Sequence, residues 1–495
     1  MSPLFELRLN RPKRGSRTSA QSLLDQLRQA IGDGRLAPGV QMPATRQSPA
    51  VFGVSRHTCA KVYEQLLNGG LLTSRHGAGT FVARRPPKIP APARRAGQHD
   101  DRVNPLWLSP GLTSALGFWR ESAPGNSPDG PATVDFRPAL VDSRLFPFDI
   151  YRRVGNQQLR AFERKPARMR SPQGNQGNHG LRDAVTHHVA VTRAIACRPD
   201  DVLVTSGAQQ GFDLLARVLV RPGETIVAIE DPGYPPLRVP FLAAGAVVVP
   251  VPVDDEGMVV DALPPGTKVI CVTPSHQFPL GIAMSPARRQ ALLAYAGAHG
   301  AVIIEDDYDG EFRYEGSPLD ALKAADRNDL VFHVGTFSKC LLPSLRLGFV
   351  IAPDWAMGAL IAAKNALDWH CSTPLQVTVA AFIVEGHLAR HVRRMRELYG
   401  RRRALLHRGL AGPLSPWLAP IPSFYGMHLT ALLRSQVDVE KAAIQMSREG
   451  IRIHTLDRYH FGEPTRTGLV FGYGAANAEQ ITKGIEHLCH VLSFL

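Results

Sequence analysis

Two stretches, AVIIEDDYDGEFRY at 301–314 and LVFHVGTFSKCLLPSLRLGF at 330–349, decide the fold of most of this chain. Each begins with a short run rich in β-branched residues. Four similar runs precede them, with helical stretches between: DVLVTSG, TIVAIED, AVVVPVPV and KVICVTP. This alternation predicts an α/β domain with a mainly parallel sheet and helices on both faces, where ligands bind at the carboxyl ends of strands. We therefore expect the functional residues directly after each run.

Side chains of complementary chemistry follow the last two runs. Asp306 and Tyr308 come after AVIIE, Lys339 comes after FHVG, and Arg346 lies seven residues later. Pyridoxal phosphate needs a lysine to form an imine, a carboxylate to keep its ring nitrogen protonated, a donor to its phenolate oxygen and an anion site for its phosphate. These four residues could fill the four roles. Taken singly, each is more often a capping or surface residue, but the combination is far more specific than any member.

The expected phosphate site also includes a helix start. The residues SGAQ at 206–209 follow the run DVLVT and open a helix, whose free N–H groups and dipole favour an anion. The candidate residues around the phosphate are Gly207, Ala208, Thr336, Ser338 and Arg346.

Positive charge is concentrated near the N-terminus. Residues 1–95 hold 16 Lys plus Arg against four Asp plus Glu, a net charge of +12, whereas the whole chain carries +14. A basic module on a nearly neutral body suggests a polyanion partner, bound through phosphate neutralisation. A solvated basic face kept for solubility is the alternative that charge alone leaves open.

The basic module, which we place at residues 16–84, is predicted to form a helix, a turn and a second, capped helix. Apolar residues recur at helical spacing after Ser19, at Leu23, Leu24, Leu27 and Ile31. A turn rich in proline and glycine follows, and a new helix start at Ser55 opens SRHTCAKVYEQLLNGG. This order is the helix-turn-helix pattern.

The second helix would present its N-terminal residues to base edges and phosphates in a major groove: Ser55, Arg56, His57 and Thr58. The next segment, LLTSRHGAGTFVA, predicts a short hairpin whose tip around Arg75 and Gly77 could lie against the phosphate backbone. A small helical bundle used for dimerisation is the alternative interpretation.

The stretches DGRLAPGVQMPATRQ, GVSRHTCAKVYEQL and GGLLTSRHGAGTFV closely resemble the winged helix-turn-helix of GntR-type repressors, over about 65 residues. The resemblance implies that Arg46, Arg56, Thr58 and Gly77 contact DNA. The chain departs from that family at residues 48–49, Ser-Pro, where a leucine and then a small residue are usual. Because Ser48-Pro49 loses an apolar core contact and proline lacks a helical N–H, we expect the short helical stretch near Arg46 to Phe52 to be shortened, or the module to be less stable.

Residues 85–132 are predicted to form a linker. The segments RRPPKIPAPARRAGQHDD and ESAPGNSPDGPA are dense in proline and charge and lack the composition of core elements. Between them, LWLSPGLTSALGFW contains Trp107, Leu108, Leu112 and Trp119. This stretch is apolar enough to dock on a neighbouring surface, either on its own body domain or on a partner subunit.

The body, residues 133–495, resembles that of the MocR/GabR subfamily of GntR regulators in four motifs: EDPGY at 230–234, TPSHQFPLG at 273–281, EDDYDGEFRY at 305–314 and GTFSKCLLPSLRLGF at 335–349. This subfamily is similar in fold to type I aminotransferases. The resemblance implies Lys339 as the imine lysine, Asp306 facing the pyridine nitrogen, Tyr308 on the phenolate oxygen and Arg346 on the phosphate. It also implies Tyr234 near the cofactor ring, and a homodimer, since type I sites borrow residues from the neighbouring subunit.

Two departures concern catalysis and the effector. The asparagine that usually precedes the Pro-Thr-Gly turn of aminotransferases is absent, so its contact to the phenolate oxygen is either missing or made by His276 or Gln277. In GABA-sensing members an arginine stands where this chain has Pro236, so recognition of that effector is not expected. Arg466 or Arg458 could hold the carboxylate of an amino compound.

Length and composition bound the remaining possibilities. A chain of 495 residues exceeds the roughly 250 to 300 residues that one core supports, so at least two domains are expected. The six cysteines form no CxxC pair and show no metal-ligand spacing, which favours reduced thiols and no metal site. There is no secretory signal and no run of about 18 apolar residues, so we expect a cytoplasmic protein that does not enter membranes.

The leading hypothesis is a transcription regulator in which an amino compound displaces Lys339 from the cofactor and shifts the arrangement of the DNA-binding modules. The second is an active aminotransferase whose N-terminal module serves only oligomerisation or localisation. A third keeps the repressor but supposes a body that no longer binds cofactor.

Overall fold

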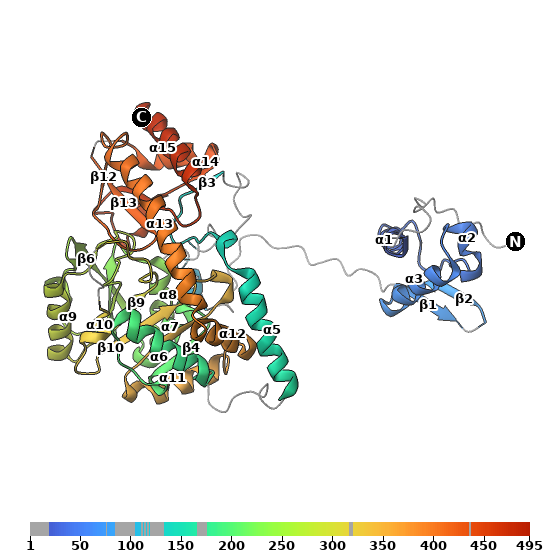
Figure 1. The fold of residues 1–495 in the computed structure, drawn as a ribbon, viewed down its shortest axis with the longest axis horizontal. Helices are drawn as coiled ribbons and strands as arrows, with labels where there is room; N and C mark the ends of the chain where they lie inside the picture. The colour runs from blue at the N-terminus through green and yellow to red at the C-terminus, as the bar shows by residue number, and fades with distance from the viewer. Residues whose placement is uncertain are drawn as a thin grey trace. The chain divides into compact units, whose positions relative to one another are not determined.

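The computed structural model describes residues 19–75, 77–84, 104–109, 112, 115, 118, 133–165, 176–315, 320–434 and 437–495. The chain divides into two compact units, Met1–Asp100 and Asp101–Leu495 (Figure 1). Most of the predicted linker lies outside the described residues.

The first unit packs helical segments against a small hairpin. Its elements are α1 (Ser19–Gly32), η1 (Thr45–Gln47), α2 (Ser48–Val51), α3 (Arg56–Asn68), β1 (Leu72–Arg75) and β2 (Gly79–Val82). All four predicted apolar positions of the first helix are buried: Leu23, Leu24, Leu27 and Ile31. They share one core with Val62 and Leu66 of α3. The predicted winged helix-turn-helix is therefore confirmed.

Helix α2 is short, and Pro49 is its second residue. It has four residues, and the 3-10 turn η1 comes directly before it. Proline is tolerated in the first turn, where its missing N–H would have no intrahelical partner. Pro49 therefore lies where its missing N–H removes no intrahelical hydrogen bond.

Helix α3 and the hairpin follow local sequence signals. Ser55 caps α3, because its Oγ accepts a hydrogen bond from the Thr58 N–H at 3.1 Å. Strands β1 and β2 pair antiparallel, and at the tip Gly77 (φ +75°) and Gly79 (φ +108°) adopt the left-handed backbone that glycine tolerates best. His76, which belongs to the predicted tip, lies outside the described residues.

An eight-stranded sheet forms the centre of the body, in the order β4-β11-β10-β9-β8-β5-β6-β7. Its strands are β4 (Val202–Thr205), β5 (Ile226–Asp231), β6 (Val247–Asp254), β7 (Gly257–Met258), β8 (Thr267–Val272), β9 (Val302–Asp307), β10 (Val331–Thr336) and β11 (Gly348–Ile351). Strands β10, β9, β8, β5 and β6 are parallel neighbours, and β4 points the same way because the antiparallel β11 separates it from β10. All six predicted runs are strands, so the mainly parallel sheet is confirmed.

Helices cover both faces of this sheet. Alternate residues of a strand point to opposite faces, so Val202 and Val204 of β4 pack with α6 and α12, whereas Leu203 packs with α7 and α11. The helices around this sheet are α5 (Phe148–Arg164), α6 (His179–Arg193), α7 (Ala208–Leu219), α8 (Pro235–Ala243), α9 (Pro286–His299), α10 (Leu322–Ala325), α11 (Asp354–Leu367) and α12 (Thr373–Val384).

The long helix α13 (His387–Ala411) runs from the helices around this sheet into a second lobe (Figure 1). Leu388 and Val392 belong to the core beneath α12, while Tyr399 and Leu406 belong to the core of the second lobe. That lobe contains the antiparallel sheet β12 (Leu418–Pro420), β13 (His428–Leu433), β16 (Gly468–Gly472) and β15 (His454–Thr455), the pair β14 (Ile451–Arg452) and β3 (Val134–Asp135), and the helices α14 (Val439–Arg448) and α15 (Ala478–Ser493). Among the described helices, none combines the length and apolar character needed to cross a bilayer.

A few residues of the predicted linker pack on the body. Leu112 and Ala115 form a small buried cluster with Val239 of α8. The ring of Phe118 meets the rings of Tyr234 and Tyr459 edge to face, at centroid distances of 5.7 and 6.2 Å. Leu112, Ala115 and Phe118 therefore pack on their own chain. Trp119 lies outside the described residues, and Trp107 and Leu108 are exposed.

Candidate functional site

A cavity of about 360 Å³ lies at the carboxyl edge of the central sheet. Its wall combines the ends of β9 and β10, the start of α7 and a segment that follows β3. It is lined by Phe118, Pro138, Ala139, Leu140, Ala208, Gln209, Phe212, Tyr234, Phe278, Asp306, Tyr308, Thr336, Ser338, Lys339, Pro343 and Arg346. A volume of this size suits a small organic ligand. The structure thus brings Lys339, Asp306, Tyr308 and Arg346 to one cavity.

Lys339 lies just beyond the end of β10. Its Nζ donates a hydrogen bond to the carbonyl oxygen of Ala139 at 2.6 Å, and Ala139 has a left-handed backbone with φ +65°. Burial lowers the pKa of Lys339 to about 8, although the nearby carboxylates of Asp309 and Asp306 act in the opposite direction. A lowered pKa makes more of the free amine, the nucleophilic form, available at neutral pH.

The carboxylate of Asp306 is buried, and one of its oxygens lacks a hydrogen-bond partner in the described part of the chain. Its Oδ1 has no hydrogen-bond partner among the described residues, and an unpaired buried oxygen of this kind is costly. Burial raises the pKa of Asp306 well above its usual value, and the carboxylates of Asp307, Asp309 and Glu230 raise it further. A cationic donor placed beside Asp306 would relieve both the missing hydrogen bond and the charge repulsion.

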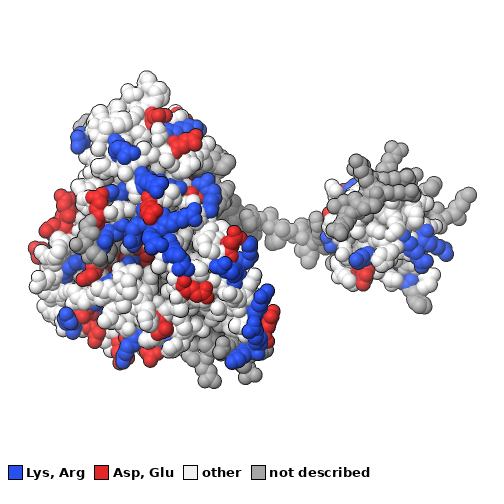
Figure 2. Space-filling model, viewed as in Figure 1, with Lys and Arg blue, Asp and Glu red and all other residues white. Residues whose placement is uncertain are grey.

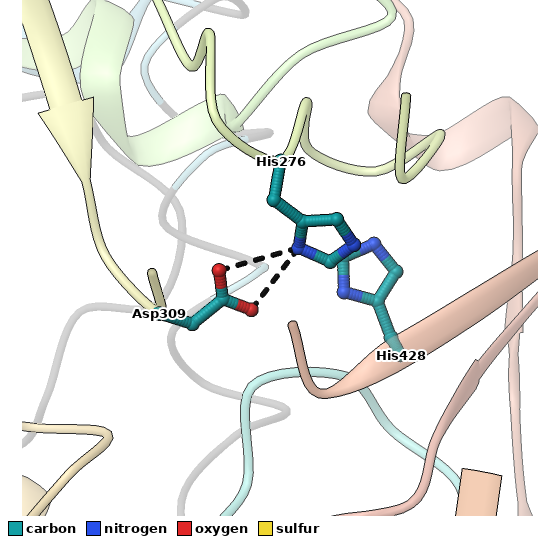
Figure 3. A group of neighbouring side chains, drawn as sticks. All are labelled: His276, Asp309 and His428. Carbon is teal, nitrogen blue, oxygen red and sulfur yellow. Dashed lines mark hydrogen bonds and ion pairs between the residues drawn. The ribbon is translucent and has the colours of Figure 1, made fainter. Parts of the chain in front are cut away.

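Tyr308 lines the cavity, and its hydroxyl group is held by hydrogen bonds to His276. The hydroxyl donates to the carbonyl oxygen of His276 at 3.0 Å and lies 2.9 Å from Nδ1 of the same residue. The same Nδ1 lies 3.2 and 3.1 Å from the two carboxylate oxygens of Asp309 (Figure 3). His276 is absent from the cavity wall described above, so its contact with a ligand there would be indirect, through Tyr308.

His276, Asp309 and His428 also place ligand-type atoms within 4.8 Å of one another, with the His428 ring beside that of His276 (Figure 3). Protein contacts account for most of this arrangement, while His276 Nε2 has no hydrogen-bond partner among the described residues. Asp309 also accepts a hydrogen bond from the Met427 N–H at 3.1 Å, and His428 Nε2 lies 2.8 Å from the Pro279 carbonyl oxygen. Burial lowers the pKa of His428 well below its usual value, which keeps that ring neutral. We therefore interpret the cluster as hydrogen-bonded support for Tyr308.

The predicted phosphate site lies at the start of α7, directly after Gly207. Arg346 Nη2 donates to the Ser206 carbonyl oxygen at 3.0 Å, and Arg346 itself has a left-handed backbone with φ +47°. A Cβ at Gly207 would lie 2.9 Å from that guanidinium nitrogen, so glycine lets the arginine approach the free N–H groups of the helix. The hydroxyl groups of Thr336 and Ser338, 3.0 Å apart, line the same cavity.

Aromatic rings form another part of the wall. The ring of Phe278 meets those of Tyr234 and Tyr308 edge to face, at centroid distances of 5.6 and 5.8 Å. Phe278 directly precedes Pro279, the position where aminotransferases usually have asparagine, and its ring cannot donate a hydrogen bond to a phenolate oxygen. The Gln277 amide donates instead to the carbonyl oxygens of residues 232 and 278, both at 2.8 Å.

The two arginines expected to hold an effector carboxylate do not line this cavity. Arg466 Nη1 lies 3.9 Å from the carboxylate of Asp255, and Arg458 lies in the 3-10 turn η8 (Asp457–Tyr459). Among the described residues, the guanidinium group that lines the cavity is that of Arg346.

The residues that were not predicted include Phe118, Ala139 and Phe278 in the cavity wall and Asp309 behind it. Asp309 stands in the EDDYD motif and Phe278 directly before the Pro-Leu-Gly turn, so the motifs could have indicated both. Phe118 and Ala139 lie outside every motif. Phe118 stands in the predicted linker and Ala139 shortly after it, and both line the cavity because they pack at the sheet edge, far in sequence from the strands that end there.

The predicted DNA-contacting residues gather around α3 and the hairpin. Arg46 in η1 and Arg56 and His57 at the start of α3 are exposed, as is Arg75 in β1. The Arg75 guanidinium lies 5.1 Å from the centroid of the Phe81 ring. The other predicted contacts are the cap Ser55, whose Oγ is engaged by Thr58, and Gly77 at the hairpin tip.

Comparison with known proteins agrees with both parts of the fold. The family described as "Bacterial regulatory proteins, gntR family" matches residues 19–82, and "Aminotransferase class I and II" matches residues 154–488. The chain is 32% identical to the probable rhizopine catabolism regulatory protein MocR of Rhizobium meliloti, over 94% of this chain and 92% of that protein. It is 33% identical to the transcriptional regulator TauR of Rhodobacter capsulatus, over 95% and 96%.

Among solved structures, the kynurenine aminotransferase of Pyrococcus horikoshii, in complex with PMP, matches with a TM-score of 0.67 and 25% identity, over 77% of this chain and 94% of that one. A winged helix-turn-helix joined to a body of type I aminotransferase fold defines a class of DNA-binding transcription regulator. The chain belongs to the MocR-type regulators of the GntR family.

Proposed function

We propose that this chain is a pyridoxal-phosphate-dependent transcription regulator whose body senses an amino compound at Lys339. The observation that carries the proposal is the convergence of four side chains on one cavity, in a chain that also has a helix-turn-helix: Lys339, Asp306, Tyr308 and Arg346. Each side chain matches one functional group of the cofactor.

Two features of the cavity support a fit to this cofactor. The Oδ1 of Asp306 is buried without a partner, and a protonated pyridine nitrogen would supply the missing cationic donor. At the other end, Gly207 and Arg346 leave the start of α7 open to a phosphate group. Lys339 would then hold the aldehyde carbon, and the Tyr308 hydroxyl would turn its hydrogen from the His276 carbonyl oxygen to the phenolate oxygen.

When bound, pyridoxal phosphate supplies an aldehyde that condenses reversibly with primary amines. The lowered pKa of Lys339 favours its free amine, which can both capture a carbonyl carbon and give way to a competing amine. Asp306 would keep the ring nitrogen protonated. Tyr308, positioned by His276 and Asp309, would hold a proton at the phenolate oxygen.

A sensor of this kind needs two arrangements of the chain that bind the amino compound differently. The relatives MocR and TauR are named as regulators, which supports a regulatory role over steady turnover. The ring of Phe278 at the position of the usual asparagine also removes a donor that aminotransferases use. We further propose that two copies pair, so that two helix-turn-helix modules contact paired half-sites.

The test uses the full chain, the DNA upstream of its own gene and a panel of amino acids and aliphatic amines. We expect visible absorbance after addition of pyridoxal phosphate, and a gel shift whose midpoint changes with one of the amines. Absence of sequence-selective DNA binding, both with and without cofactor, would contradict the proposal. Steady conversion of an amino acid and a keto acid, without DNA binding, would favour the aminotransferase hypothesis instead.

A further inference from the structure

A second cavity, of about 270 Å³, lies beside the first but shares no lining residue with it. Asp306 faces the cofactor cavity, whereas its neighbour Asp307 forms an ion pair with Arg193, which lines the second cavity. Successive residues of a strand point to opposite faces, so the end of β9 separates the two cavities. Its lining includes Arg193, Ser275, Arg313 and Arg396.

The second cavity is rich in positive charge. It lies where α13 crosses the body, and on that face arginine and lysine side chains gather over α13 (Figure 2). The exposed arginines of this helix are Arg390, Arg393, Arg394, Arg396, Arg401 and Arg408. The net charge of the body is small, but this part of its surface is basic.

Three guanidinium groups from separate segments line the cavity. Arg193 is buried and already neutralised, because it pairs with Asp307 and, at 3.3 Å, with Glu311. Among the residues that the structure describes, Arg313 and Arg396 have no carboxylate within ion-pair distance. Arg396 donates from Nε and Nη2 to the Glu311 carbonyl oxygen, at 3.0 and 2.7 Å, which leaves Nη1 for another acceptor.

Arg313 and Arg396 also act on each other. Partial burial lowers the pKa of the Arg396 guanidinium and the charge of Arg313 lowers it further, while the Glu311 carboxylate acts in the opposite direction. Two like charges that approach a shared cavity, neither in an ion pair with a described carboxylate, are stabilised when an anion lies between them. The cavity therefore has the electrostatics of an anion site.

A buried hydroxyl group points to the same conclusion. Ser275 is 8% exposed, and its Oγ is buried without any hydrogen-bond partner among the described residues. Buried polar atoms are normally hydrogen-bonded, so an unpartnered hydroxyl in the wall of a cavity indicates a ligand atom or water beside it. A hydroxyl donor beside two guanidinium groups matches a phosphate or carboxylate group.

We propose that this cavity is a second ligand site, which binds a small metabolite through its phosphate or carboxylate group, held by Arg313, Arg396 and Ser275. A volume of 270 Å³ is slightly below the range of about 300 to 1,000 Å³ that drug-sized ligands occupy, so the ligand is small. The site does not depend on the proposed cofactor, because none of its residues line the cofactor cavity.

The two sites have a short physical connection. Ser275 is followed by His276, whose Nδ1 lies 2.9 Å from the Tyr308 hydroxyl group. An anion that engages Ser275 would therefore act one residue from the group that supports Tyr308. By linkage, such coupling would be reciprocal between the two ligands.

The test is equilibrium dialysis of the full chain, loaded with pyridoxal phosphate so that the other anion site is filled. Radiolabelled inorganic phosphate and succinate are the two probes. We expect one saturable site per chain for one of them, and a loss of about tenfold to a hundredfold in affinity in Arg313→Gln and in Arg396→Gln. Ser275→Ala should weaken binding by a smaller factor.

Arg408→Gln is the matched control, since Arg408 is exposed on the same helix about 18 Å further along. It should bind the probe as wild type does. Phosphate preference would identify a phosphate ester as the ligand class, and succinate preference a carboxylate. The proposal is overturned if neither probe binds saturably, or if both arginine variants, folded by their thermal unfolding, bind like wild type. Because dialysis needs no DNA, this outcome is separate from a failure of the regulatory proposal.

Discussion

Lys339 and Ala139, which stand 200 residues apart in the chain, meet through a hydrogen bond of 2.6 Å from the lysine Nζ to the alanine carbonyl oxygen. The contact directs the amine into the cavity that also holds Asp306 and Tyr308. It also ties the segment that follows the linker to the end of β10. A displacement of Ala139 would therefore move Lys339, and the reverse. This hydrogen bond is one way in which a movement of the linker could change the position of the amine in the cavity.

Replacement of Lys339 is expected to abolish the visible absorbance that pyridoxal phosphate gives with the wild-type chain. The reason is that no other described lysine lines the cavity. The measurement is an absorbance spectrum of Lys339→Ala after dialysis against cofactor. Lys323→Ala, at a lysine paired with Asp326, is the control and should keep the wild-type spectrum. Equal spectra for wild type and Lys339→Ala would show that the lysine is not the attachment point.

Capture of the cofactor should depend on pH through Lys339. With a pKa of about 8, about 9% of the amine is free at pH 7, against about 0.03% for a lysine of pKa 10.5. The capture rate, followed by stopped-flow absorbance, should rise about tenfold per pH unit below pH 8 and level off above it. A rate that still rises steeply between pH 9 and 10 would show that the pKa is not lowered.

Asp306→Asn should have opposite effects on the free and the loaded protein. Because burial raises the pKa of Asp306, its charge destabilises the fold without a cation, and this cost grows as pH rises from the unfolded pKa toward the folded one. The neutral amide should raise the Tm of the cofactor-free chain at pH 7. It should also weaken cofactor binding by about 2 kcal/mol, or roughly 30-fold, through loss of a charged hydrogen bond. Thermal unfolding and spectroscopic titration measure the two effects, and changes of the same sign would refute the assignment.

Gly207→Ala should weaken cofactor binding more than backbone strain alone explains. The φ of +82° costs an alanine on the order of 1–3 kcal/mol, and the new Cβ would also displace the Arg346 guanidinium 2.9 Å away. Gly223→Ala is the matched control, because Gly223 has φ +77° with no atom within 4 Å of its Cβ position. Both variants should lose Tm, but only Gly207→Ala should lose affinity, by about tenfold. Equal cofactor affinities in Gly207→Ala and Gly223→Ala would show that Arg346 does not contact the phosphate.

Arg56→Ala should reduce DNA binding by about 1–3 kcal/mol, because Arg56 is exposed at the N-terminus of α3. Fluorescence anisotropy with the upstream DNA, at several salt concentrations, measures both the affinity and its salt slope. Arg28→Ala, exposed on α1, is the control and should change neither. If Arg56→Ala and Arg28→Ala lose equal affinity for the DNA, helix α3 does not face the groove.

Much of the fold could be predicted from the sequence because its signals are local. The period of Leu23, Leu27 and Ile31 and the cap at Ser55 depend only on helix geometry and nearby hydrogen bonds. The grouping of Asp306 and Lys339 was also predictable, since the carboxyl ends of parallel strands meet at one edge.

The sequence by itself determined the two folds, six strands of the mainly parallel sheet and the side chains gathered at their ends, whereas the antiparallel strands β7 and β11 appear only in the structure. Only the tertiary structure decided that His276 supports Tyr308 from behind, that Phe278 forms a wall, and that Arg466 lies away from the cavity. It alone joined Arg313 to Arg396, which stand on different segments of the body. The physical reason is that spacing along a chain sets hydrogen bonds and faces within an element, whereas contacts between distant segments depend on how whole elements pack.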